Sequence, residues 1–332
     1  MFILRQNLIR LQISAICLVL ISFSVLSQNS YILHPSHTFE DRGKKLIISN
    51  LLPEFNQTSG DVYFQYQETS FKLQTISSEL KYGIPYQLVS DHETFTLYFS
   101  ELPLINAQSY QTIVTYSDDL VPGKFEISDT EGFYYSSFIG IKVRGATSRS
   151  YPKKSYQIRL WTDSASYETK DESFFQMRND DKWLLLAMWN EQNRLNNVFC
   201  HDLWLRMHKL YYADSELKAN SAIRLKYVEF FLDGNYQGVY AFSENMDRKQ
   251  LKLKKTKEGN IRGELYKGIS WGQGLHRYLT DEQSAQILKD IVKIKIGKAD
   301  ESLAKEFFSH FCRINGMNEN MINEPNGGLL KK

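Results

Sequence analysis

The chain has 332 residues, of which 42% are hydrophobic and 14% aromatic, enough apolar side chains for folded domains rather than a disordered chain. Its length predicts about two domains. The formal net charge is only +2, and two of the cations, Arg5 and Arg10, lie in the first 27 residues. This balance excludes the strongly basic domain expected of a nucleic-acid-binding protein, so we expect no nucleic-acid partner.

The first 27 residues have the pattern of a secretory signal peptide. The two arginines precede an apolar run from Ile13 to Leu26, and the small residue Ser27 stands at a plausible cleavage point. The apolar run is short for a membrane span, although an uncleaved anchor is the alternative. We therefore expect a secreted or cell-surface protein with no membrane span after cleavage.

Removal of the signal peptide would leave a chain with 38 Lys and Arg against 38 Asp and Glu, because the segment carries two cations and no anions. It would also leave two cysteines, Cys200 and Cys312. In an exported protein such a pair can form a disulfide, and two unpaired buried thiols are the alternative.

Residues 28–118 are predicted to form a small β-sandwich domain. Short runs alternate apolar and polar side chains, as expected for strands with one buried face, at residues 45–49, 61–67, 94–100 and 110–117. No spacing in this region suggests catalysis, so we interpret it as a binding or spacer domain. We place its boundary near residue 119, just before the turn Val121-Pro-Gly123.

Residues 119–332 are predicted to form a second domain with both strands and helices. A strand is expected at 138–143 and a buried apolar run at 183–189, followed by a helix over about 191–210. Two apolar runs around Asp233-Gly234 predict a hairpin over residues 227–242. Beyond it we expect a strand at 263–267 and helices over about 281–294 and 301–311.

The stretch from Val143 to Leu160 carries the strongest chemical signal. Arg144 and Arg149 flank a turn at Gly145, and Lys153 and Lys154 follow just before an alternating strand. A glycine turn can expose backbone amides that bind an anion, so this layout is typical of a phosphate-binding hairpin. Neighbouring strand side chains point to opposite faces, so only one lysine can enter a cleft. Ordinary solvated charges are the alternative reading of the lysine pair.

Several separated motifs resemble those of the spore-coat kinase (CotH) family. They are Arg144-Gly145, Ser148-Arg149, Pro152-Lys-Lys-Ser-Tyr156, Asp181-Lys-Trp-Leu-Leu-Leu-Ala187, Asn197 and Gly238-Val-Tyr-Ala-Phe-Ser-Glu244. The resemblance implies an α+β fold with an atypical kinase-like domain that uses ATP and Mg, and extracellular or coat proteins as substrates. It also implies that the lysine strand contacts the nucleotide phosphates, while the Gly-Val-Tyr strand and Glu244 border the base. A salt bridge to a lysine is the structural alternative for Glu244.

The chain departs from the family pattern in two places. The helix has Asn196-Asn197 where the family commonly has an Arg-Asn pair, which weakens any role needing a positive charge there. No Asp follows Asp300, and the Trp-Asp-x-Asp motif of the family is missing, so no metal or catalytic residue can be assigned. We therefore expect an incomplete, inactive kinase-like domain. A binding or structural protein acting through its β-sandwich, or a gene fragment, are the alternatives.

Overall fold

The computed structural model describes residues 30–254, apart from 56–60, 75–78, 92 and 211, together with the backbone of two later strands. The predicted signal peptide, the helix at 301–311 and Cys312 lie outside the described residues. The chain divides into two compact units, the first comprising Met1–Leu203 and Arg224–Asn245, the second Trp204–Ile223 and Met246–Lys332. Both large sheets of the molecule belong to the first unit.

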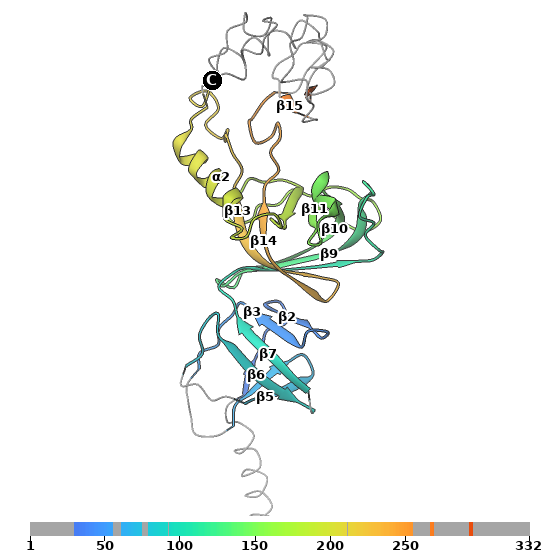
Figure 1. Ribbon diagram of the computed structural model, residues 1–332, viewed down its shortest axis with the longest axis vertical. Coiled ribbons are helices and arrows are strands. Elements are labelled where there is room, and N and C mark those ends of the chain that lie inside the picture. Colours follow the sequence, from blue (N-terminus) through green and yellow to red (C-terminus); the bar gives the residue numbers. More distant parts are fainter. Residues whose placement is uncertain are drawn as a thin grey trace, which may run out of the picture. The chain divides into compact units, whose positions relative to one another are not determined.

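The N-terminal strands form one continuous seven-stranded sheet, in the order β1-β4-β5-β6-β7-β3-β2 (Figure 1). The strands are β1 (Ser30–Ile32), β2 (Thr38–Asp41), β3 (Leu46–Ser49), β4 (Tyr63–Tyr66), β5 (Thr69–Leu73), β6 (Pro85–Ser90) and β7 (Glu93–Phe99). Alternate side chains are fully buried on one face, among them Ile47, Phe64, Leu88, Leu97 and Phe99. The predicted two-sheet sandwich is therefore wrong. β7 pairs with both β6 and β3, so the hydrogen bonding continues across the whole sheet.

The second sheet closes into a seven-stranded barrel, in the order β10-β11-β12-β14-β13-β8-β9. Its strands are β8 (Leu104–Ser109), β9 (Val121–Ser128), β10 (Tyr134–Arg144), β11 (Ser155–Trp161), β12 (Lys182–Leu186), β13 (Leu225–Leu232) and β14 (Asn235–Ser243). The parallel pairing of β13 with β8 closes it, and the other pairs are antiparallel. The predicted hairpin is confirmed as β13–β14, whose turn residues Asp233 and Gly234 both have positive φ.

Large side chains fill the barrel. Inward-facing side chains of its strands form one buried cluster, which includes the alternate residues Ile139, Ile141 and Val143 of β10. Near one end, Trp183 stacks on Phe242 with ring centroids 4.9 Å apart. Because the interior is packed, a ligand site on this barrel must lie at its rim or on its outer surface.

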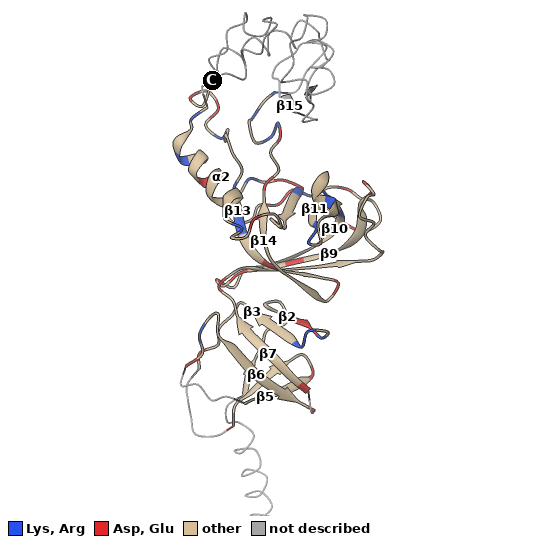
Figure 2. Cartoon of the chain, viewed as in Figure 1, with Lys and Arg blue, Asp and Glu red and all other residues tan. Residues whose placement is uncertain are grey.

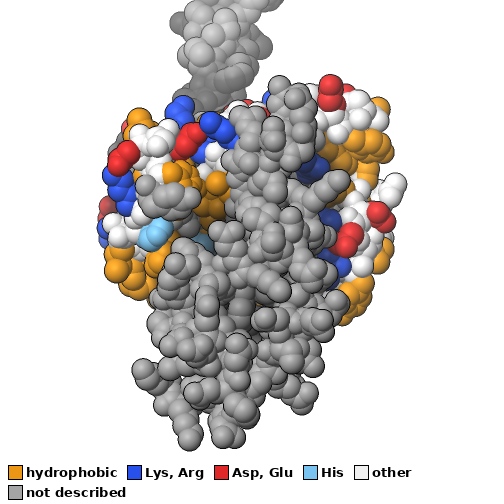
Figure 3. Space-filling view, turned by 90° about the horizontal axis from the view of Figure 1, so that it is seen from above, with side chains coloured by type: hydrophobic (Ala, Val, Ile, Leu, Met, Phe, Trp, Pro, Cys, Tyr) orange, Lys and Arg blue, Asp and Glu red, His pale blue; other side chains and the backbone are white. Residues whose placement is uncertain are grey.

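The predicted α+β kinase-like fold is wrong for the part of the chain that the structure describes, where two β-sheets dominate. Its helices there are α2 (Asn196–Met207) and the short 3-10 helix η1 (Thr147–Ser150). Leu195, Phe199 and Leu203, which recur at helical spacing, are 53%, 62% and 40% accessible, and Figure 3 shows hydrophobic side chains on the exposed surface of the described residues. The sequence has helical periodicity here, but no other described residues cover these apolar side chains.

The remaining described strands, β15 (Tyr266–Gly268) and β16 (Val292–Ile294), form an antiparallel pair. β15 overlaps the strand predicted at 263–267. β16 contradicts the last residues of the helix predicted over 281–294, whose other residues are not described. In the described part of the chain, no helix has the length and apolar character needed to cross a membrane.

Candidate functional site

The glycine turn after β10 has the geometry that the sequence predicted. Gly145 has a φ of +115°, and a Cβ at this position would lie 1.9 Å from the Oγ of Ser148. A larger residue would therefore suffer both torsional strain and a steric clash. The tight turn leads into η1, where the amide of Arg149 donates to the carbonyl of Ala146 at 3.1 Å.

The predicted cations do not converge on one point. Arg149 donates to a carboxylate oxygen of Asp118 at 2.5 Å, and this interaction lowers the pKa of Asp118. The ammonium of Lys154 donates to the carbonyl of Arg149 at 2.7 Å and borders a pocket of about 600 Å³. Arg144 lies opposite Ser155 on β11, and burial lowers the pKa of its guanidinium. Figure 2 shows Lys and Arg positions, coloured blue, along the ribbon around β10 and β11.

Lys153 points away from Lys154 and toward β14. Its ammonium donates to the carbonyl of Val239 at 2.6 Å and lies 4.2 Å from the ring centroid of Tyr240. Gly238, with a φ of +86°, has no side chain to cover the ammonium, and a Cβ there would lie 3.5 Å from it. Burial, followed by the positive charge of Arg194, lowers the pKa of Lys153 to about 8. Of the two lysines, Lys153 is therefore the one beside the Gly-Val-Tyr strand.

Arg194 is a second cation in this region and was not among the residues predicted from the sequence. It lies in the loop before α2, where its carbonyl accepts a hydrogen bond from the hydroxyl of Tyr227 at 2.7 Å. Its charge lowers the pKa of Lys153 and opposes the rise in the pKa of Tyr240. The Nε atom of Arg194 is buried without a hydrogen-bond partner among the described residues. A positive φ of 51° at Arg194 fixes the loop in an uncommon conformation.

One sequence signal for Arg194 was available, because Asn196-Asn197 replaces the Arg-Asn pair common in the family. The helix lacks the arginine that the family commonly has, yet Arg194 supplies a positive charge two residues earlier. Asn197 instead donates through its amide to Glu191 at 2.6 Å, which orders the start of α2. Neither Lys153 nor Arg194 forms an ion pair with any carboxylate in the described part of the chain. The charge of Glu229 acts on Lys153 without forming an ion pair with it, so two neighbouring cations remain available to an anion such as phosphate.

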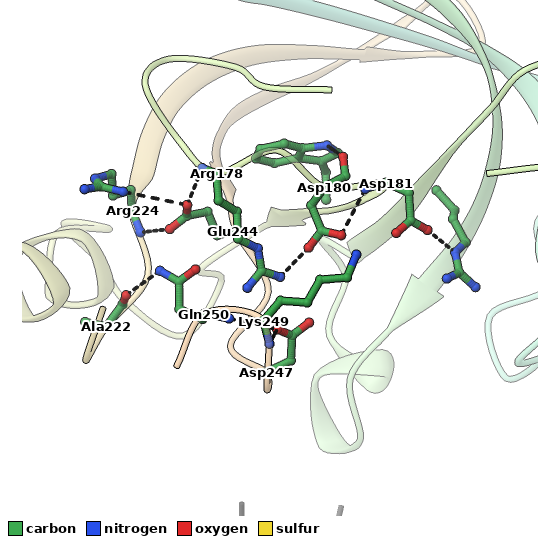
Figure 4. Close-up of polar contacts among 11 residues, drawn as sticks. Arg178, Asp180, Asp181, Ala222, Arg224, Glu244, Asp247, Lys249 and Gln250 are labelled. Atoms are coloured by element: carbon green, nitrogen blue, oxygen red, sulfur yellow. Dashed lines mark hydrogen bonds and ion pairs between the residues drawn. The ribbon is translucent and has the colours of Figure 1, made fainter. Parts of the chain in front are cut away.

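Glu244 occupies a different place from Lys153. Its buried carboxylate accepts hydrogen bonds from the backbone amides of Arg178 at 2.7 Å and Arg224 at 2.8 Å, and the Arg224 guanidinium lies 3.9 Å away (Figure 4). It lies five residues beyond Val239, roughly 16 Å along an extended strand. The Glu244 carboxylate therefore acts as a clamp between the chain segments of Arg178 and Arg224, at a different place from Lys153.

One cluster of acids could be considered for a metal ion. Carboxylate oxygens of Asp171, Asp180 and Asp181 lie within 4.8 Å of one another. The two buried members are already neutralised, because Arg178 pairs with Asp180 and Arg159 pairs with Asp181. These acids do not fit a magnesium site without loss of both ion pairs, so we assign them a structural role and no metal.

The family relationship is clear from the sequence profile of the CotH kinase protein family, which matches residues 141–320. The matched segment begins in β10 and contains the glycine turn, Lys153, Arg194 and the β13–β14 hairpin. No curated protein matches the chain at a significant level of similarity. The family match covers more than half of the residues, and the chain therefore belongs to the CotH kinase family, whose members are kinase-like spore-coat proteins.

Proposed function

We propose that this protein binds ATP, with the phosphates held by Lys153 and Arg194. The observation that carries the proposal is the pair of neighbouring cations, neither of which forms an ion pair with a carboxylate of the described residues. A phosphate between them would add negative charge beside both cations and accept charge-assisted hydrogen bonds from both side chains. The family's general use of ATP supports the same ligand.

The neighbouring strand supports the orientation of the nucleotide. Lys153 lies against Gly238, Val239 and Tyr240 of β14, the strand expected by resemblance to border the base. If the ATP phosphates lie at the Lys153 ammonium, the adenine base lies close to β14. Arg144 and the amides after Gly145 form a second group of donors, and the described contacts do not join them to Lys153.

The proposal does not extend to phosphate transfer. Transfer in kinases needs acidic groups that hold magnesium against the phosphates. In the described part of the chain, Asp180 and Asp181 are neutralised by arginines, and Glu244 accepts hydrogen bonds from backbone amides. We therefore propose that the protein binds nucleotide without efficient transfer, and that it is exported, as the pattern of its first 27 residues suggests. N-terminal sequencing of protein from the producing cells tests the export.

Isothermal titration calorimetry of the full chain with ATP tests the binding proposal, and Lys153→Met and Lys154→Met are the matched pair of variants. We expect Lys153→Met to abolish the binding heat, whereas Lys154→Met should retain it, because Lys154 bonds to the carbonyl of Arg149 on the other side of the hairpin. Equal affinity in all three proteins would contradict the assignment. A radioactive γ-phosphate transfer assay, with and without magnesium, then tests the proposed lack of transfer.

A further inference from the structure

A pocket of about 560 Å³ lies within the first unit, between the seven-stranded sheet and the barrel. Its walls come from β3, β7 and the segment after β7 on one side, and from β13 and β14 on the other. The contacts that hold these parts together are specific. The amide of Tyr236 donates to the buried carboxylate of Asp41 at 2.8 Å, and Phe39 packs against Phe231. Lys153 and Arg194 do not line this pocket, although the charge of Glu229 acts on Lys153 and that of Arg194 on Tyr236.

The pocket contains a buried carboxylate that forms no ion pair with the described residues, although its charge acts on Lys153. Glu229, which is 9% exposed, projects from the outer face of β13 into the pocket lining. Its oxygens accept hydrogen bonds from the hydroxyl of Ser100 at 2.9 Å and from the hydroxyl of Tyr236 at 2.5 Å. Among the described residues, no cation forms an ion pair with it. Burial of an unpaired carboxylate is costly, and an ionised carboxylate can accept about four hydrogen bonds.

The rest of the lining matches the chemistry of a cation. Tyr82, Tyr98 and Tyr236 contribute three aromatic rings, and Glu101 adds a second, exposed carboxylate. Aromatic rings attract ammonium groups, and desolvation strengthens that attraction. Lys44, whose ammonium lies 5.9 Å from the ring centroid of Tyr236, is already committed, because it bonds to Asp41 at 2.9 Å and to the carbonyl of Tyr236 at 2.6 Å.

We propose that this pocket binds an organic ammonium ion carried on a short alkyl chain, with the charge at Glu229 and the chain against the apolar wall. Leu46 and Ile48 of β3 supply that wall. The ammonium would donate to the free acceptor positions of the carboxylate and lie among the tyrosine rings. A free alkylamine and a lysine side chain of another protein share this chemistry.

Calorimetry on the full chain with n-butylammonium chloride tests the proposal, and n-butanol serves as the neutral probe of the same size. We expect binding of the ammonium and none of the alcohol. A peptide with one central lysine, compared with its norleucine analogue, separates the two sources of the ligand. Binding of the free amine alone indicates a small-molecule ligand, and binding of both indicates that a protein lysine can enter. Equal binding of alcohol and amine, or no heat with any amine at millimolar concentration, would overturn the proposal.

Two variants locate the site. Glu229→Gln and Tyr98→Leu should each weaken n-butylammonium binding by about tenfold or more, since one removes the charge and the other an aromatic ring. Glu93→Gln, on an exposed carboxylate of the same sheet that pairs with Lys45, is the control and should bind normally. If Glu229→Gln does not fold, Tyr98→Leu combined with Glu101→Gln decides the question. Unchanged affinity in the folded variants would assign the binding to another surface.

Discussion

Replacement of Lys153 by methionine should change the pH dependence of stability as well as ATP binding. In the folded protein, burial and then Arg194 lower the pKa of this lysine to about 8 from its usual value of 10.5. Between these two pH values the unfolded chain holds the proton and the folded chain has released it. The stability of the wild type therefore rises with pH in this window and is lowest below pH 8.

The size of the effect follows from the pKa difference. About 1.4 kcal/mol for each pH unit gives an upper limit of about 3 kcal/mol between the two pKa values. The ammonium is only half-buried, so solvent screening reduces this to about 1–2 kcal/mol. The Lys153→Met variant also loses the hydrogen bond to Val239 and the contact with Tyr240, which offsets part of the stability gained by removing the charge. This loss is the same at every pH at which the lysine is charged.

Urea unfolding of both proteins at several pH values from neutral to about 9.5 measures the predicted difference. The free energy of unfolding of the wild type should rise relative to that of Lys153→Met as pH increases above 8. The raised tyrosine pKa values are common to both proteins and cancel in the comparison. Two parallel stability curves would refute the reasoning, because Lys153 would then titrate alike in the folded and unfolded chains. ATP affinity of the wild type should fall over the same pH interval, as the ammonium loses its proton.

Two further substitutions test the local geometry. Gly145→Ala should lower the free energy of unfolding by about 1–3 kcal/mol, because the φ of +115° and the contact with Ser148 both disfavour a side chain. Adding Ser148→Ala should restore only the part of the lost stability that comes from the clash. Full recovery of stability would show that the φ angle of residue 145 contributes no strain. Glu244→Gln should cost about 2–3 kcal/mol in urea unfolding, since one acceptor oxygen must replace two that bind backbone amides. The exposed Glu131→Gln is its control, and equal stability of these two variants would contradict the clamp.

Local patterns predicted many strands but not how they pair. Alternation located β3, β4 and β7 to within about two residues, and Asp233-Gly234 identified the β13–β14 turn. The run at 110–117 also alternates, yet it lies in the loop between β8 and β9. Barrel closure depends on the pairing of β8 with β13, which are separated by more than a hundred residues. No local periodicity encodes such a contact, so β8 was grouped by sequence with the N-terminal strands, and the kinase-like α+β class was assigned by resemblance.

The site was predicted only in part for a related reason. The glycine turn and the divergence of the two lysines follow from backbone rules that act over a few residues. The identity of the useful lysine depends on β14, because Val239 and Tyr240 fix the ammonium. Arg194 could not be found from spacing, since a loop of uncommon conformation brings it near Lys153.

The same comparison explains why Lys153 is a better functional candidate than Glu244, although both are buried charges. Glu244 is satisfied within the fold, by two backbone amides and a nearby guanidinium, so its burial serves stability. The ammonium of Lys153 has one carbonyl and one aromatic ring as direct contacts. Burial and the neighbouring Arg194 lower its pKa, and the charge of Glu229 opposes them only in part. A fold optimised only for stability would not place Arg194 beside it. An anionic ligand reverses the balance, because it stabilises both cations, and binding should then raise the pKa of Lys153 and take up a proton near pH 8.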